Sequence, residues 1–142
     1  MINVKYIETE NEYNSALSIR KEVFIEEQNV SIEEEIDEYE KIATHILALD
    51  NSKAVGTARW RYTDDGVKLE RFAVLEPYRS HGVGRALVEF TVDELKEENL
   101  LYLNAQEYVI PFYRKFNFEE IGDIFYEAEI PHKKMVYNKE IV

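Results

Sequence analysis

The sequence predicts one α/β (α+β) domain over residues 1–142, with a mixed sheet of six to seven strands flanked by helices. Two observations predict this class. Three apolar segments of strand length, Thr44–Asp50, Ala54–Thr63 and Val67–Leu75, are joined by links short enough for antiparallel hairpins. A helical segment then connects the third of them to a further strand, Leu100–Gln106, and strands joined by such a crossover run parallel.

The N-terminal elements follow from hydrophobic periodicity. Alternating apolar residues predict a half-buried strand over residues 2–6. Helical spacing predicts a helix over residues 11–26, with Arg20 on the same stripe as Leu17 and Phe24.

The later elements are predicted in the same way. Apolar spacing predicts a crossover helix from Val83 to about Glu98 and a shorter helix over Val109–Phe116. One or two antiparallel strands, around Glu119–Gly122 and His132–Asn138, are expected to complete the sheet.

Composition excludes several classes of function. The 142 residues contain no cysteine, which excludes disulfides, thiolate metal sites and a cysteine nucleophile. The net charge of −12 argues against a nucleic-acid partner, because phosphate neutralisation needs clustered Lys and Arg. No membrane span or signal peptide is evident, so a cytoplasmic protein without a membrane partner is expected.

Much of the negative charge falls in one acidic segment, residues 33–40, where the acids are Glu33, Glu34, Glu35, Asp37, Glu38 and Glu40. One interpretation is a solvated face, and another is a field that draws cationic amines towards an acceptor site. Interleaved Val30, Ile32 and Ile36 predict that the segment is ordered.

The loop between the predicted strand and crossover helix suggests anion binding. Backbone N–H groups at a helix N-terminus lack intrahelical partners. Gly82 and Gly84 leave that backbone open, and Arg79 and Arg85 add positive charge, which together suits a pyrophosphate. The alternative is a turn that needs positive φ. The spacing fits neither GxxxxGK[ST] nor GxGxxG.

The pattern Arg79-x-x-Gly82-x-Gly84 resembles the acyl-CoA pyrophosphate loop of the GNAT acetyltransferase superfamily. Downstream, Leu101–Gln106 resembles the family's next strand. Val109–Phe118 resembles its aromatic-Tyr helix, with Asn117 where glycine is common. Other parts resemble the bacterial ElaA-like N-acetyltransferase branch, namely Val23–Val30, His45, Ile130–His132 and Met135.

The resemblance implies acetyl-CoA as co-substrate, bound where the two central parallel strands splay apart, and no metal. It places the pantetheine arm along the backbone of residues 72–74 and the pyrophosphate on residues 82–85. The expected cofactor-binding residues are Phe72, Ala73, Val74, Arg79, Ser80, His81, Gly82, Val83, Gly84, Arg85, Asn104, Gln106 and Tyr113.

Aminolysis of a thioester needs a neutral amine, stabilisation of the oxyanion, and a proton for the departing thiolate. Tyr113 resembles the family tyrosine that protonates the sulfur, and its alternative is a core aromatic. Glu70 resembles the glutamate that serves some members as base. Its alternative is an ion pair with Arg59 or Arg61 on the neighbouring strand.

The three histidines are widely separated, which makes a poor metal site. His45, His81 and His132 each have an intrinsic pKa that suits a base. His81 lies in the loop, where an accessory cofactor contact is expected, and His132 is a candidate for binding the acceptor. Trp60 is expected to pack in the sheet, with a place in the acceptor cleft as its alternative.

These observations predict an N-acyltransferase that moves an acetyl group from acetyl-CoA to a primary amine by direct attack in a ternary complex. The alternatives are a catalytically idle acetyl-CoA sensor and an acidic interaction protein that binds no cofactor. The acceptor, a small molecule or a protein amine, stays open. So do the acyl length and the oligomeric state, a homodimer included.

Overall fold

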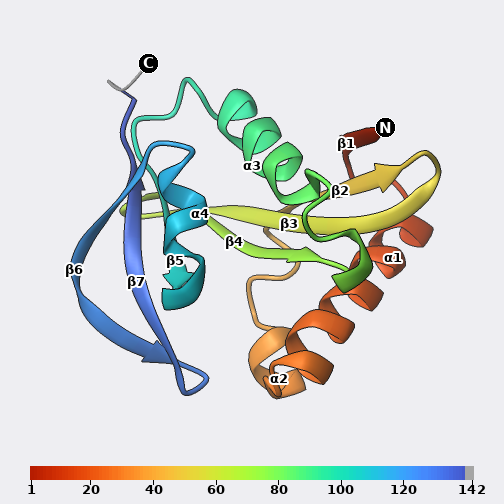
Figure 1. The fold of residues 1–142 in the computed structure, drawn as a ribbon, viewed down its shortest axis with the longest axis horizontal. Coiled ribbons are helices and arrows are strands. Elements are labelled where there is room, and N and C mark those ends of the chain that lie inside the picture. Colours follow the sequence, from red (N-terminus) through yellow and green to blue (C-terminus); the bar gives the residue numbers. More distant parts are fainter. Residues whose placement is uncertain (140–142) are drawn as a thin grey trace.

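In the computed structural model, which describes residues 1–139, the strands form one seven-stranded sheet in the order β1-β2-β3-β4-β5-β7-β6 (Figure 1). This confirms the predicted mixed α/β class. The strands are β1 (Ile2–Tyr6), β2 (Thr44–Asp50), β3 (Lys53–Thr63), β4 (Gly66–Val74), β5 (Leu101–Gln106), β6 (Phe118–Glu127) and β7 (Ile130–Tyr137).

Helices flank the sheet on both sides. The α-helices are α1 (Glu10–Arg20), α2 (Ile32–Glu35), α3 (Val83–Glu94) and α4 (Ile110–Arg114). The 3₁₀ helices are η2 (Glu76–Tyr78) and η3 (Glu107–Val109), and the π-helix is η1 (Lys21–Glu27). The helix predicted over residues 11–26 is therefore α-helical only as far as Arg20.

The two faces of the sheet have separate hydrophobic cores. On β2, Ile46 belongs to the larger core, with Leu87 of α3 and Ile110 of α4. Its neighbour Leu47 belongs to a smaller core with Ile19 of α1. Because successive strand residues point to opposite faces, α3 and α4 cover one face and α1 covers the other (Figure 1).

The predicted hairpins and the parallel crossover are both present. β2, β3 and β4 pair antiparallel in sequence, whereas β4 and β5 pair parallel. The parallel ladder is short, because it joins only three residue pairs, from Val67–Leu101 to Leu69–Leu103. Both strands continue past these pairs, so they separate at their C-terminal ends.

A β-bulge lies in β4 where the pairing with β5 stops. The register with β3 shifts between Thr57 and Arg59, so that an extra β4 residue stands in this interval. Arg71 there has φ of 59°, a left-handed conformation uncommon for a non-glycine residue. Bulges bend a strand, and this bend occurs at the point of separation.

The C-terminal strands are longer than predicted. β6 begins at Phe118 and ends at Glu127, and β7 pairs with both β5 and β6. Asn117, before β6, has φ of 70°, the conformation expected of a residue that replaces glycine at a helix end.

Candidate active site

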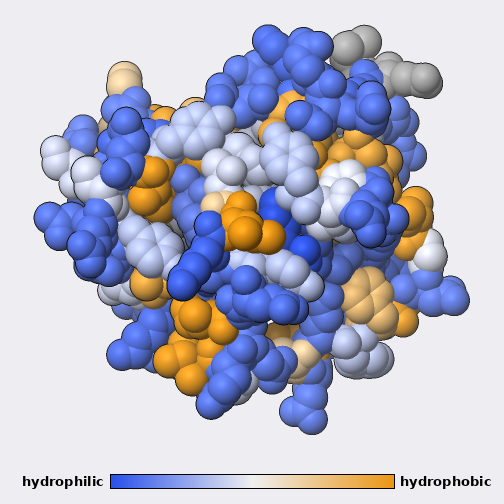
Figure 2. Space-filling model, turned by 180° about the vertical axis from the view of Figure 1, so that it is seen from behind, coloured by the Kyte–Doolittle hydropathy of each residue, from blue (hydrophilic) through white to orange (hydrophobic). Residues whose placement is uncertain are grey.

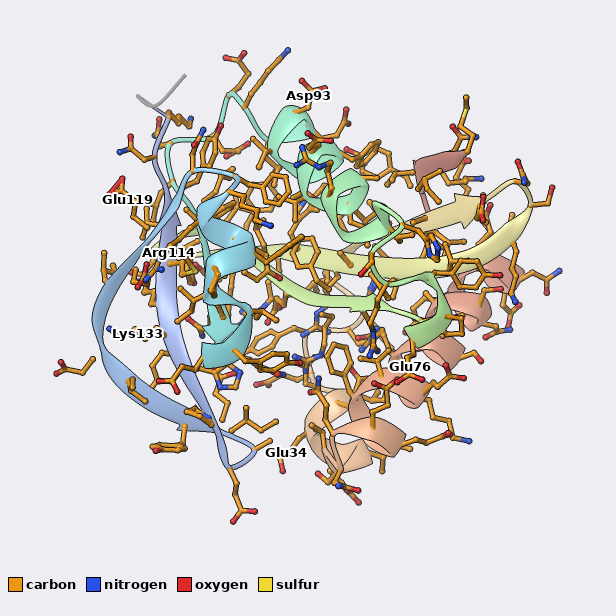
Figure 3. All side chains as sticks on the ribbon, viewed as in Figure 1. Glu34, Glu76, Asp93, Arg114, Glu119 and Lys133 are labelled. Atoms are coloured by element: carbon orange, nitrogen blue, oxygen red, sulfur yellow. The ribbon has the colours of Figure 1, made fainter. Side chains whose placement is uncertain are left out.

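A cleft of about 550 Å³ opens where β4 and β5 separate. One wall comes from β4, with Glu70, Arg71 and Phe72, and the opposite wall from Asn104, Ala105 and Gln106 of β5. Residues of α2 and of the β6–β7 turn also line the cleft, and Figure 3 labels Glu34 of α2 on the side near that turn. The further lining residues are Phe24, Gln28, Val30, Glu33, Glu35, Asp37, Tyr39, Arg61, Lys68, Leu69, Leu103, Tyr108, Val109, Tyr113, Glu127, Ala128, Ile130 and His132.

The β4 edge of the cleft offers backbone groups for a ligand. The Leu75 N–H donates to Val55 of β3 at 3.0 Å, so the preceding residue, Val74, directs its backbone groups away from β3. The same alternation applies to Phe72. β5 does not pair with either residue, and an extended chain could therefore add to this edge, as the pantetheine arm is expected to do.

The loop before α3 has the geometry of an anion site at Gly82. This residue is the N-cap of α3, with φ of 85° and no side-chain cap, and a Cβ placed on it would meet nothing within 4 Å. The first N–H groups of α3 therefore face open space. Gly82 thus has the positive φ that a turn needs, and the open space beside it is compatible with a phosphate, whose binding here stays a prediction.

Gly84 has a different role. A Cβ there would lie 3.1 Å from the Phe112 ring, so this glycine permits close packing of α3 on α4. Val83 buries its side chain in the core, and only its backbone can reach a cofactor. Ser80 and His81 are exposed in the loop, where an anion can meet them.

The two arginines of the loop are not equally free. Arg79 donates to the Val74 carbonyl at 2.9 Å and to both carboxylate oxygens of Glu27, at 2.9 and 3.1 Å. Arg85 is largely exposed, 3.4 Å from Glu89. Arg79 therefore ties the loop to β4 and η1, and Arg85 carries the more available charge.

The β5 side of the cleft is bridged by polar side chains. Gln106 donates to Gln28 across the cleft at 2.8 Å, and Asn104 donates to Glu127 at 3.0 Å. Sequence analysis missed Gln28, since no local pattern indicates that the residue after η1 meets β5.

Tyr113 belongs to the core and also borders the cleft, and its expected role as proton donor stays a prediction. Its ring packs edge-to-face on Phe72, Phe112 and Phe118, within the larger core. The side chain also lines the cleft, and within residues 1–139 its hydroxyl makes no hydrogen bond. Burial raises the pKa of Tyr113 above its ordinary value, so the hydroxyl holds its proton.

Glu70 lies in the cleft and in ion pairs. It accepts from Arg61 at 2.8 Å and lies 3.2 Å from Arg59 and 3.5 Å from Lys68. The alternative considered from the sequence, pairing with Arg59 or Arg61, is therefore present. Its expected role as the base stays a prediction.

Glu70 belongs to a larger group that we call the arginine–carboxylate network, made of Arg20, Arg59, Arg61, Arg71, Glu35, Asp37, Glu40 and Glu70. Arg20 and Arg59 are 1% exposed, and both donate to Glu40 at 2.7 Å. Burial acts to raise the pKa of Glu40, but hydrogen bonds from Arg20 and Tyr13 outweigh it and lower that pKa to about 2.

The interpretation of the acidic segment as a solvated face holds only in part, because Glu33, Glu34 and Glu38 are exposed but the other three acids belong to the network. Glu35 and Glu40 are buried, whereas Ile32 and Ile36, expected to order the segment, are exposed. The segment is held instead by arginines, including Arg71, which lies 2.9 Å from the Glu35 carboxylate. Arg20 on the apolar stripe of its helix was the sequence signal for this.

The remaining candidates divide between core and cleft. Trp60 is 3% exposed in the larger core and does not line the cleft, so it packs in the sheet as expected. The His45 ring bonds the Glu40 carbonyl at 2.9 Å, also outside the cleft. His132 does line the cleft.

Over residues 1–139, no helix is long and apolar enough to span a bilayer. The same residues hold no group of three or more His, Asp or Glu side chains placed to bind a metal ion.

Both the sequence and the fold are similar to those of known proteins. The family model of the acetyltransferase (GNAT) domain matches residues 7–139. YjcF of Bacillus subtilis, named as an uncharacterized N-acetyltransferase, is 40% identical over 130 residues, covering 89% of this chain and 93% of that protein.

Solved structures agree. The crystal structure of Escherichia coli ElaA has a TM-score of 0.85 at 27% identity, covering 97% of this chain and 100% of that one. A GNAT family acetyltransferase from Elizabethkingia anophelis, solved with acetyl-CoA bound, shares the fold with a TM-score of 0.65 at 16% identity, covering 95% and 94%. The chain belongs to the GNAT acetyltransferase family and is similar to its ElaA-like members.

Proposed function

We propose that the protein is an N-acetyltransferase that moves an acetyl group from acetyl-CoA to a primary amine by direct attack in a ternary complex. The observation that carries the proposal is the cleft between the separated ends of β4 and β5, next to the open N-terminus of α3. The acetyl-CoA bound to the Elizabethkingia anophelis relative supports the same ligand here.

The residues present fit such a ligand. Phe72 and the Val74 N–H offer backbone groups of the free β4 edge to the pantetheine arm, and the Val74 carbonyl is bound by Arg79. Gly82 and the N-terminus of α3 offer N–H groups to the pyrophosphate. Acetyl-CoA supplies the activated acetyl group. The remaining expected contacts, from Arg79, Ser80, His81, Arg85, Asn104 and Gln106, are part of the proposal.

Tyr113 is proposed to donate the proton that the departing sulfur needs. Its hydroxyl faces the cleft without a partner, and its raised pKa keeps it protonated at neutral pH. A backbone N–H of β4 at Phe72 or Val74 would face the developing oxyanion. Glu70 is the base that the resemblance implies. A cytoplasmic location is proposed with this activity.

Thermal unfolding with and without acetyl-CoA tests the cofactor. At about 100 times Kd, a ligand that binds only the folded state stabilises it by about 2.7 kcal/mol. For a domain near this size the midpoint should rise by about 5–11 °C. No shift at millimolar acetyl-CoA would exclude both the enzyme and the sensor. Turnover of an amine, detected as free thiol, then separates these two.

A further inference from the structure

We propose that His132 is the general base that takes the proton from the attacking amine. This proposal rests on the proposed function. It assigns the role of base to a histidine that the sequence made a candidate for acceptor binding, and it differs from the expectation that Glu70 is the base.

A backbone carbonyl orients the imidazole ring of His132. Nδ1 of His132 lies 2.7 Å from the Ile130 carbonyl oxygen, and a carbonyl can only accept a hydrogen bond. Nδ1 therefore carries a proton, and in the neutral ring Nε2 bears a free lone pair. This is the tautomer that a base acting through Nε2 requires.

The position of Nε2 also suits a base. His132 is 6% exposed and lines the cleft, and Nε2 is not fully enclosed by protein atoms. Within residues 1–139 it makes no hydrogen bond, and its nearest charged neighbour is the Glu127 carboxylate at 3.9 Å. The Phe125 ring stacks on the imidazole ring, with 5.9 Å between the two ring centroids.

His132 lies next to the part of β5 that has separated from β4. The last pair of β4 with β5 is Leu69–Leu103, and His132 pairs with Gln106 beyond it. Alternation along the strands puts His132, Gln106 and Glu70 on the same face of the sheet, on the two sides of the cleft. Both candidate bases therefore face the same space.

The contacts of the two candidates differ. Glu70 is surrounded by Arg59, Arg61 and Lys68, and taking a proton would weaken all three ion pairs. His132 has an anion beside it instead, and Glu127 would stabilise the imidazolium that forms. The geometry therefore favours His132 as the acceptor of a proton and Glu70 as a fixed negative charge.

The amine nitrogen bonds to the acetyl carbon, and its proton passes to His132 Nε2. The C–S bond breaks, and the sulfur takes the proton of the Tyr113 hydroxyl. The proton held by His132 returns to Tyr113 through solvent, so both side chains are restored and the products are the N-acetyl amine and the free thiol.

The test uses the whole protein with an amine that it accepts, found by screening primary amines with acetyl-CoA for release of thiol. His132→Asn keeps a side-chain N–H near the Nδ1 position but removes Nε2, and His132→Gln removes the base while staying polar. Both should lower kcat/KM for the amine by about 100-fold at pH 7, with the acetyl-CoA thermal shift unchanged. His45→Asn, a histidine outside the cleft, should stay within about threefold of wild type.

The pH profile separates a base from a structural residue. The acidic limb of kcat/KM should disappear in the His132 variants and persist in Glu70→Gln. The charged or titratable groups on the elements packed around His132 are Glu119, Glu120, Asp123, Tyr126 and Glu127 of β6, Lys133, Lys134 and Tyr137 of β7, Tyr102 of β5, and Glu107 and Tyr108 of η3. Glu127→Gln should lower kcat/KM for the amine, because the imidazolium that forms during the transfer loses the anion beside it.

Three results would overturn the proposal. One is kcat/KM within about threefold of wild type in a folded His132 variant. Another is loss of the acidic limb in Glu70→Gln while His132→Asn retains it. If both His132 variants unfold, a kcat/KM in Glu127→Gln equal to that of wild type counts against it. Absence of any acetyl-CoA thermal shift in the wild type would instead show that the proposed function itself has failed.

Discussion

At the scale of single residues, Tyr113 combines a packed aromatic ring with a hydroxyl that is proposed to act in catalysis. Three aromatic rings fix its position, and the cleft leaves its hydroxyl without a partner. Because the ring supplies the packing, removal of the oxygen alone should leave the fold unchanged. The hydroxyl can therefore be tested separately from the ring.

Tyr113→Phe should lower kcat by about 10–100-fold and leave acetyl-CoA affinity unchanged. General-acid catalysis contributes about 10²–10⁴-fold, and the low end is expected because a thiolate, with pKa near 8.5, is already a good leaving group. Steady-state kinetics where chemistry limits the rate would measure this. Tyr102→Phe removes a hydroxyl that bonds Thr63 outside the cleft, so it is the matched control. Equal kcat in the two variants would assign Tyr113 to the core alone.

At the scale of elements, the loop and the first turn of α3 form a unit in which each glycine has its own purpose. Gly82 needs positive φ and borders open space, whereas Gly84 needs room for Phe112. A substitution at Gly84 would therefore mix loss of helix packing with loss of binding. Gly82 is the cleaner position for testing the phosphate site.

Gly82→Asn should weaken acetyl-CoA binding by at least 10-fold, because the new side chain would fill the space in front of the α3 N–H groups. Asn tolerates positive φ, so the strain should be small. Gly122→Asn is the matched control, since Gly122 in β6 also has positive φ, 77°, and open surroundings. Titration calorimetry would compare the two. Similar affinity in both variants would move the phosphates away from Gly82.

Elements with local signals could be predicted from the sequence, and those that depend on distant partners could not. The Asp65-Gly66 turn and the helical crossover fixed the order and direction of β3, β4 and β5. The bulge at Arg71 had no signal, because positive φ is typical of glycine and asparagine. The π-helical form of η1 likewise has no distinct periodicity in the sequence.

The same division applies to the candidate site. The loop at Gly82 could be found because its chemistry lies in a few consecutive residues. The network could not, since Glu40 meets Arg20 and Arg59 from segments far apart in the chain. The availability of Nε2 in His132 depends on the Ile130 carbonyl and on the cleft, neither of which a sequence displays.

At the scale of the whole molecule, the arginine–carboxylate network makes stability depend on pH. The pKa of Glu40 is about 2 in the folded protein, against an ordinary value of 4.5. The ionised carboxylate therefore stabilises the fold above pH 4.5, and this contribution is lost as pH falls towards 2. The small hydrophobic areas on the face shown in Figure 2 do not contribute to this pH dependence, because aliphatic side chains do not titrate.

Glu40→Gln should lower the free energy of unfolding at pH 7 by about 3–5 kcal/mol, because Arg20 and Arg59 lose a buried counter-charge. It should also flatten the fall of stability between pH 4.5 and 2. Urea unfolding at several pH values would measure both effects.

Glu38→Gln removes the same charge from an exposed position in the same segment and serves as the control. It should change stability by less than about 0.5 kcal/mol. Identical pH slopes for Glu40→Gln and wild type would show that Glu40 does not titrate as the network requires.

The short ladder between β4 and β5 has a consequence for how the molecule fluctuates. Within residues 1–139, three residue pairs make up the β-ladder that joins a four-stranded portion, β1 to β4, to a three-stranded portion, β5 to β7. The two portions can therefore open against each other with less loss of hydrogen bonding than any other division of the sheet. A ligand held along the free edge of β4 and against β5 would bridge them. Amide hydrogen exchange in both portions would then slow together, although neither had gained a strand of its own.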